Sequence, residues 1–371
     1  MKKKTPLLPS GLYDLLPPDA SKESRAITQL LGTFASFGYD QVSPPLMEFE
    51  ASLLEGRGKE LSEQTFRVLD PIAHEMMGIR ADMTLQVARI ASSRLAAMPR
   101  PLRLCYAGPI VQSKAETLRS ERQLTQAGAE LIGSDSINAD TEIIIIAAEA
   151  LAQLGIEDIS IDINLPELLG ELCPEAKNDS ALQAKIKNAV TQKNTDMVAQ
   201  LPIVNNKLLA SLIDAAGPVE KTLAVLEKLK IKQASAIRTL SEHIGRNCPK
   251  VKLTLDPIEY RGFDYHSGIS FSIFAKGLRY ELGRGGRYIV DGEKATGFTI
   301  YVTHLLTLLP SMPPEKYVMV TQEAGTAAVR ELRTKGWTTI YALTDNVKKE
   351  AELLGIKSRL AADGKTIEEI K

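Results

Sequence analysis

Gln126, Gly128 and Glu130 are the residues of this chain whose types and spacing most clearly suggest ligand binding. They alternate with small or apolar residues along the run from Leu124 to Ile132. Since successive side chains of a strand point to opposite faces, the three share one face of a predicted strand. Two polar residues flanking a glycine would form the floor of a site for a small polar ligand. The pattern alone equally fits a solvated sheet face.

A second polar group, Arg80-Ala-Asp-Met-Thr84, lies directly before a predicted helix. Asp82 and Glu130 could act as a general acid/base couple if the fold brings them together. The alternative is that Asp82 or Thr84 only caps the helix, because side-chain oxygens at that position accept unpaired backbone N–H groups.

The glycine-rich stretch Gly283-Arg-Gly-Gly-Arg-Tyr288 combines two features of phosphate sites. Glycines let backbone N–H groups approach an anion, and arginines donate paired hydrogen bonds. The stretch matches neither the Walker pattern nor the dinucleotide fingerprint. A tight glycine turn beside a sheet is the alternative.

The histidines and cysteines are dispersed and show no metal or nucleophile spacing. They are His74, His243, His266, His304, Cys105, Cys173 and Cys248. We therefore expect no catalytic residue, no metal, no cofactor and no disulfide framework. A lone histidine on an apolar segment, such as His304, is typical of a satisfied core or surface residue.

Composition indicates an ordinary soluble protein of two or three domains. The 371 residues are 44% hydrophobic and 25% charged, with a net charge of −1, so no global basic field predicts nucleic acid or an anionic membrane as partner. The basic start lacks an apolar run after it and does not resemble a signal peptide. We expect a cytoplasmic protein without a membrane span.

The elements that must position these residues alternate between helix and strand in the first half. Apolar spacing predicts helices over 26–38, 83–98 and 138–154, and strands over 39–49 (interrupted by two prolines), 102–106, 124–132 and 159–163.

The second half contains a helical stretch, more strands and a small α/β unit. We predict helices throughout 165–247, strands over 251–255, 269–274 and 279–282, a helix over 298–309, and a β/α unit after the Pro310–Pro314 linker. The predicted domains are 1–164 with 248–311, an inserted helical domain over 165–247, and a C-terminal domain over 315–371.

Taken together and in order, these motifs resemble histidyl-tRNA synthetases over roughly residues 8–309. Gly38-Tyr-Asp-Gln-Val-Ser-Pro-Pro resembles the first motif of class II synthetases, and Tyr106-Ala-Gly-Pro the start of the second. The stretches that resemble the amino-acid-binding segments of the family are Arg80-Ala-Asp-Met-Thr84, Gln126-Ala-Gly-Ala-Glu130 and Arg261-Gly-Phe-Asp-Tyr-His266. Gly285-Gly-Arg-Tyr288 resembles the turn that follows the last of these.

The resemblance implies an α+β fold with a mixed, mainly antiparallel sheet flanked by helices, a helical insertion and a small C-terminal α/β domain. It also implies an amino-acid pocket. The candidate ligands of histidine are Asp82, Thr84, Gln126, Glu130, Arg261, Tyr265 and His266, with His266 in place of a tyrosine.

The chain departs from the synthetases where they bind ATP. Gln112 and His304 replace two arginines, Lys114 replaces an acid, and the bulky Tyr301 stands where a glycine admits the nucleotide. Each preorganised donor that is lost costs about 3–4 kcal/mol of transition-state stabilisation. Together with the shortened C-terminal domain, these departures argue against aminoacylation, and no tRNA partner is expected.

A pocket kept without its nucleotide chemistry resembles the regulatory subunits of ATP phosphoribosyltransferase. That resemblance implies a non-catalytic protein that forms a hetero-octamer with the short catalytic subunit, a homodimer through the class II interface, and feedback inhibition by histidine. Two alternatives stay open: a divergent class II ligase that forms aminoacyl-adenylates, and an assembly scaffold with an empty pocket.

Overall fold

A computed structural model gives the fold of this protein. It describes residues 7–54, 59–115, 120–259, 267–310, 316–361 and 363–370. The chain forms two compact units, Met1–Leu309 and Pro310–Lys371. Arg261, Tyr265 and His266 lie outside the described residues.

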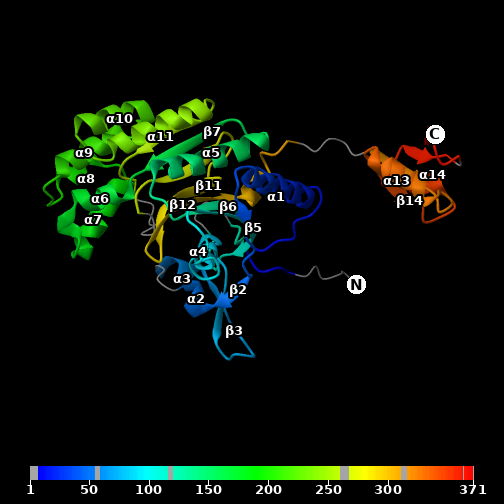
Figure 1. Cartoon of the computed structure of the whole chain (residues 1–371), viewed down its shortest axis with the longest axis horizontal. Helices are drawn as coiled ribbons and strands as arrows, with labels where there is room; N and C mark the ends of the chain where they lie inside the picture. Colours follow the sequence, from blue (N-terminus) through cyan, green and yellow to red (C-terminus); the bar gives the residue numbers. More distant parts are fainter. Residues whose placement is uncertain are drawn as a thin grey trace. The chain divides into compact units, whose positions relative to one another are not determined.

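A mixed sheet of nine described strands forms the centre of the first unit (Figure 1). The strand pairs are antiparallel except β1 with β5 and β7 with β9, so the predicted mainly antiparallel sheet is confirmed. In spatial order the strands are β1 (Asp40–Gln41), β5 (Leu102–Val111), β6 (Gln123–Ile132), β12 (Glu293–Tyr301), β11 (Gly283–Val290), β10 (Ser270–Ala275), β7 (Ile159–Asn164), β9 (Lys252–Asp256) and β8 (Gly217–Pro218).

Helices α1 (Asp19–Ser36) and α5 (Ile137–Gln153) cover one face of this sheet. Ala26, Leu30 and Phe34 recur four residues apart, so they share one side of α1 and are buried there. They belong to the same core as Ala127 and Ala129 of β6.

Helix α4 (Thr84–Ser93) packs over the other face, where Met83, Val87 and Ala91 are buried against Tyr106. It is shorter than the predicted helix 83–98. The residues that position the candidate site therefore lie between α4 and the sheet.

The helical insertion predicted over 165–247 is present between β7 and β9 (Figure 1). Its apolar residues continue the core that lies under α1 and α5. Its elements are α6 (Pro166–Leu172), the 3-10 helix η1 (Pro174–Ala176), α7 (Ser180–Thr191), α8 (Thr195–Ala199), α9 (Asn206–Ala215), β8, α10 (Val219–Lys228) and α11 (Ala234–Asn247).

A smaller antiparallel sheet was not predicted. It has the order β2 (Met47–Phe49), β4 (Met76–Ile79), β3 (Phe66–Leu69), with helices α2 (Glu50–Leu54) and α3 (Lys59–Gln64) beside it. The predicted strand over 39–49 is divided at its prolines into β1 and β2, which belong to different sheets. Both pieces are edge strands, as expected for residues flanking prolines that lack an N–H donor.

Two predictions near the end of this unit are wrong. Residues 279–282 form no strand, and the predicted helix 298–309 is instead the end of β12 followed by the short helix α12 (Val302–Leu305). β12 is a central strand buried on both faces, so its apolar residues run together without alternation and resemble a buried helix.

The C-terminal unit is the predicted alternating β/α domain. Its sheet has the order β14-β13-β15-β16, parallel except for the last pair, and β16 was not predicted. The elements are β13 (Lys316–Val320), α13 (Thr326–Thr334), β14 (Trp337–Tyr341), α14 (Val347–Leu354), β15 (Ser358–Leu360) and β16 (Ile367–Glu369). Across both units, the described helices include none with the length and apolarity required to cross a membrane.

Candidate functional site

The candidate site is built on the face of β6 that α4 covers. Gln126, Gly128 and Glu130 share that face as predicted, since the intervening Ala127, Ala129 and Leu131 pack into the core on the opposite side. Gln126 and Glu130 each keep only 1% of their surface exposed. The alternative of a solvated sheet face is therefore wrong.

Glu130 is held at the centre by phenol hydroxyls from two neighbouring elements. Tyr288 of β11 donates to its Oε2 at 2.6 Å, and Tyr106 of β5 donates to its Oε1 at 3.2 Å. The Tyr106 hydroxyl also lies 2.7 Å from the Thr299 hydroxyl and 3.0 Å from the Thr84 hydroxyl. Four hydroxyl groups thus join one buried carboxyl in a single network.

Burial raises the pKa of Glu130 to about 8, although the hydrogen bonds from Tyr288, Thr84 and Tyr106 act in the opposite direction. A carboxylate buried away from water favours its neutral form. Glu130 is therefore mostly protonated at neutral pH, and a ligand that brings a positive charge or a strong donor would stabilise its ionised form.

Asp82 connects the start of α4 to β6. Its Oδ1 accepts the backbone N–H of Thr84 at 2.8 Å, and its Oδ2 accepts the side-chain amide of Gln126 at 2.9 Å. The Gln126 carbonyl oxygen in turn accepts the backbone N–H of Met83 at 3.1 Å. Asp82 therefore accepts one N–H at the helix start, although Met83 occupies the N-cap position, and it also fixes the orientation of Gln126.

Two glycines make room for the polar side chains of this network. A Cβ built on Gly297 of β12 would collide with the Glu130 carboxyl group, and one on Gly128 would collide with the Tyr106 hydroxyl. The backbone approaches these polar groups so closely that no larger residue fits.

The structure brings together Asp82, Thr84, Gln126 and Glu130 of the predicted set. Sequence reasoning did not assign Tyr106, Tyr288 or Thr299 to the site. Tyr106 and Thr299 are both register partners of Gly128 on the flanking strands, but that register becomes visible only once the sheet is known.

The substituted positions that were expected to lie toward a nucleotide begin next to this network, because Tyr301 is the register partner of Gln126. Tyr301 and His304 are both buried, with ring centroids 5.0 Å apart, and Arg284 lies 5.8 Å from the Tyr301 ring. His304 Nδ1 lies 3.1 Å from the Glu281 carbonyl oxygen. Aromatic side chains of the chain itself occupy this region.

Gln112 and Lys114 are the other two substituted positions. Gln112 is buried, and its backbone N–H donates to the Arg122 carbonyl oxygen at 2.7 Å. Lys114 is exposed and pairs with Glu63 at 3.2 Å. The charge of Lys114 is thus neutralised at the surface by a carboxylate.

Both interpretations of the glycine-rich stretch Gly283–Tyr288 are wrong, because it forms the central strand β11. Arg284 contacts the Glu281 carboxylate, and Arg287 pairs with Asp140 at 2.7 Å. A Cβ on Gly283 would collide with the Thr299 carbonyl oxygen, and one on Gly285 with the Phe271 ring. These glycines permit close strand packing rather than a turn or a phosphate cradle.

Metal and thiol chemistry have no geometric basis in the part of the chain that the structure describes. There, no three His, Cys, Asp or Glu side chains group in a way that could hold a metal ion. Cys105 and Cys173 are buried, and burial raises the pKa of each thiol to about 11. Both thiols therefore stay protonated and unreactive at neutral pH.

Comparison with known proteins places this geometry in a family. A model of the histidyl-tRNA synthetase family matches residues 11–305. The ATP phosphoribosyltransferase regulatory subunit of Paramagnetospirillum magneticum is 44% identical over 366 residues, which cover 96% of this chain and 97% of the relative. That of Rhodospirillum centenum is 41% identical over 353 residues, covering 93% and 92%. The chain belongs to the family of ATP phosphoribosyltransferase regulatory subunits.

Solved structures support the fold of this regulatory subunit. A protein described as an ATP phosphoribosyltransferase regulatory subunit/histidyl-tRNA synthetase from Bacillus halodurans has a TM-score of 0.79 at 22% identity, covering 94% of this chain and 97% of that one. The histidyl-tRNA synthetase of Nostoc has a TM-score of 0.76 at 19% identity, covering 97% and 93%. The regulatory subunit therefore has the class II synthetase fold. Its regulatory rather than catalytic role rests on the relatives that are 41–44% identical to it.

Proposed function

We propose that this regulatory subunit senses histidine in the pocket around Glu130 and transmits its presence to the short catalytic subunit of ATP phosphoribosyltransferase, at the first step of histidine biosynthesis. One observation carries the proposal. The polar residues suited to an amino acid form a connected, buried network, whereas the neighbouring nucleotide positions are occupied by the chain's own aromatic rings.

Each part of histidine has a complementary group in this placement. The ammonium group lies toward Asp82, Thr84 and Gln126, whose acceptor oxygens gather at the start of α4. The imidazole ring lies toward Glu130 and shares a proton with its carboxyl group. The carboxylate lies toward Arg261, with Tyr265 and His266 beside the ligand; these three assignments rest on the family resemblance alone.

Feedback requires histidine to bind the active and inhibited states of the complex unequally. A coupling free energy of about 1–3 kcal/mol would make histidine bind one of these two states roughly 5- to 150-fold more tightly than the other. We propose that the complex is a hetero-octamer in which regulatory subunits pair through the class II dimer interface, and that the regulatory subunit also supports basal activity.

Calorimetry on the isolated chain tests the pocket. Wild type is expected to bind histidine, and Glu130→Ala to lose most of that affinity because the imidazole loses its partner in a buried site. Glu157→Ala is the matched control, since Glu157 is exposed and pairs with surface Lys250. Equal affinity in wild type and Glu130→Ala would show that the placement is wrong.

A second experiment uses the assembled complex. Arg261→Ala should weaken histidine inhibition without lowering basal activity. Full inhibition in that assembly would exclude Arg261 as the carboxylate ligand, and the absence of histidine binding by wild type would favour the scaffold alternative.

A further inference from the structure

A second pocket lies on the opposite side of strand β11 from the Glu130 network. Successive residues of a strand face opposite ways, so Tyr288 reaches Glu130 while Arg287 enters this other pocket. The pocket encloses about 250 Å³ between the start of α5, α6, α11 and β10. That volume is sufficient for an amino-acid-sized ligand.

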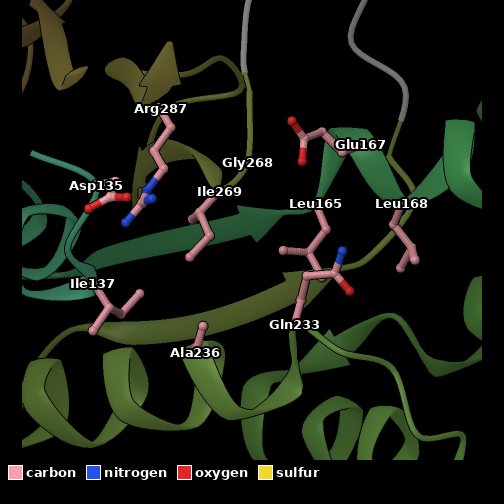
Figure 2. Close-up of a pocket in the computed structure, with 10 residues that line it drawn as sticks. All are labelled: Asp135, Ile137, Leu165, Glu167, Leu168, Gln233, Ala236, Gly268, Ile269 and Arg287. Atoms are coloured by element: carbon pink, nitrogen blue, oxygen red, sulfur yellow. The ribbon is translucent and has the colours of Figure 1, made fainter. Parts of the chain in front are cut away.

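The walls of this pocket are aliphatic. Leu165, Leu168 and Ile269 are buried, and Ile137 and Ala236 complete the lining (Figure 2). No aromatic ring is among its described lining residues. The walls therefore suit a branched or unbranched aliphatic group.

Arg287 is a fixed cation at one end. Its Nε donates to Asp140 Oδ2 at 2.7 Å, and its Nη2 lies 2.7 Å from the same oxygen. Asp140 is buried, with 2% of its surface exposed, so the guanidinium is held in a single orientation. Figure 2 shows the guanidinium directed into the pocket. Its Nη1 forms no hydrogen bond with a described residue and can donate to a ligand carboxylate.

Three other lining residues, Asp135, Glu167 and Gln233, offer hydrogen-bond acceptors to a ligand in the same pocket. Asp135 and Glu167 line it without an ion pair to any described residue, and both are exposed at its mouth. The side-chain oxygen Oε1 of Gln233 is buried and has no hydrogen-bond partner among the described residues. Because Asp140 neutralises Arg287, these groups leave the mouth with a net charge of about −2. A ligand must therefore bring a cation or donors as well as an anion.

We propose that this pocket is a second effector site that binds a small α-amino acid with an aliphatic side chain. Its carboxylate lies on Arg287, its ammonium group faces Asp135, Glu167 and Gln233, and its side chain packs among the leucine and isoleucine walls. The site is separate from the candidate histidine pocket and does not depend on that pocket's assignment.

L-Leucine is the probe, titrated into the full chain and followed by calorimetry and ligand-observed NMR. Wild type is expected to bind it, whereas leucinamide and N-acetyl-leucine, which each lack one charge, should bind at least tenfold more weakly. The double variant Asp135→Asn/Glu167→Gln, which changes only exposed groups, should also weaken leucine binding at least tenfold. Ala236→Phe, which fills the pocket, should abolish it.

Glu130→Ala is the matched control and should bind leucine like wild type, while Ala236→Phe should keep its histidine affinity. This pair separates failure of the second site from failure of the histidine placement. The proposal is overturned if wild type does not bind leucine, or if a folded Ala236→Phe protein binds it with unchanged affinity.

Discussion

The buried carboxyl of Glu130 makes the pH dependence of histidine binding a specific test of the proposed pocket. Its pKa of about 8 means that the unliganded protein holds a proton there at pH 7. Free imidazole, with a pKa of about 6.5, is mostly neutral at that pH. The proposed contact contains one titratable proton shared between carboxyl and ring. At pH 7 the two partners together bring that single proton.

The magnitude follows from proton counting. Above pH 8 Glu130 has lost its proton, so binding must take one up and the affinity falls about tenfold, or 1.4 kcal/mol, per pH unit. Below about pH 6.5 the ring arrives protonated beside a protonated carboxyl, so binding must release one proton and the affinity falls again. We expect a plateau of highest affinity between about pH 6.5 and pH 8.

The assay is calorimetry from pH 6 to pH 9 in two buffers whose ionisation enthalpies differ, which gives both affinity and the number of protons exchanged. Wild type should exchange almost no protons at pH 7 and take up nearly one more than the Glu130→Gln variant at pH 9. That variant keeps an acceptor oxygen but cannot titrate, and loss of the ligand's ammonium proton affects both proteins equally.

The reasoning is refuted if the two affinity profiles run parallel from pH 7 to pH 9. It is refuted equally if wild type takes up no more protons than Glu130→Gln at pH 9. Either result would show that the ligand does not share a proton with this carboxyl group.

Two further predictions concern packing and chemistry. Gly297→Ala should destabilise the protein by about 1–3 kcal/mol in urea unfolding and weaken histidine binding, because its Cβ displaces the Glu130 carboxyl. Gly32→Ala in α1, where nothing lies within 4 Å of the added Cβ, is the control and should cost no stability. Equal stability of the two variants would contradict the close approach of Gly297 to Glu130. The chain should show no histidine-dependent ATP–pyrophosphate exchange above background. The two arginine donors replaced by Gln112 and His304, at about 3–4 kcal/mol each, would lower the rate by several orders of magnitude. Measurable exchange would instead support the divergent-ligase alternative.

Local sequence patterns were sufficient to predict the helices and strands that have one apolar and one polar face. The stripe of α1 is set by one buried face. The alternation of β6 is set by an apolar face toward the core and a polar face toward α4, so the sequence records both patterns directly. The placement of Gln126, Gly128 and Glu130 on one face of β6 followed from that alternation. The fold class followed from resemblance rather than from these patterns.

The partners of Glu130 were beyond such reasoning for a physical reason. Tyr288 donates to a residue 158 positions earlier in the chain, and no periodicity encodes a contact of that separation. β11 and β12 were misassigned because central strands buried on both faces lose their alternation and because their glycines, placed for close packing, resemble turn signals.

The Tyr106 hydroxyl has one hydrogen and two lone pairs, yet it lies among three oxygens: those of Glu130, Thr84 and Thr299. When Glu130 is ionised, Tyr106 donates to it and keeps only its lone pairs for the threonine hydroxyls beside it. When Glu130 carries its proton toward Tyr106, the phenol instead has a hydrogen to give, and one threonine must turn around. The charge on one buried carboxyl therefore determines how the hydroxyl hydrogens on β5, β12 and α4 are oriented. A ligand that fixes that charge fixes these orientations as well, through hydroxyl rotation alone.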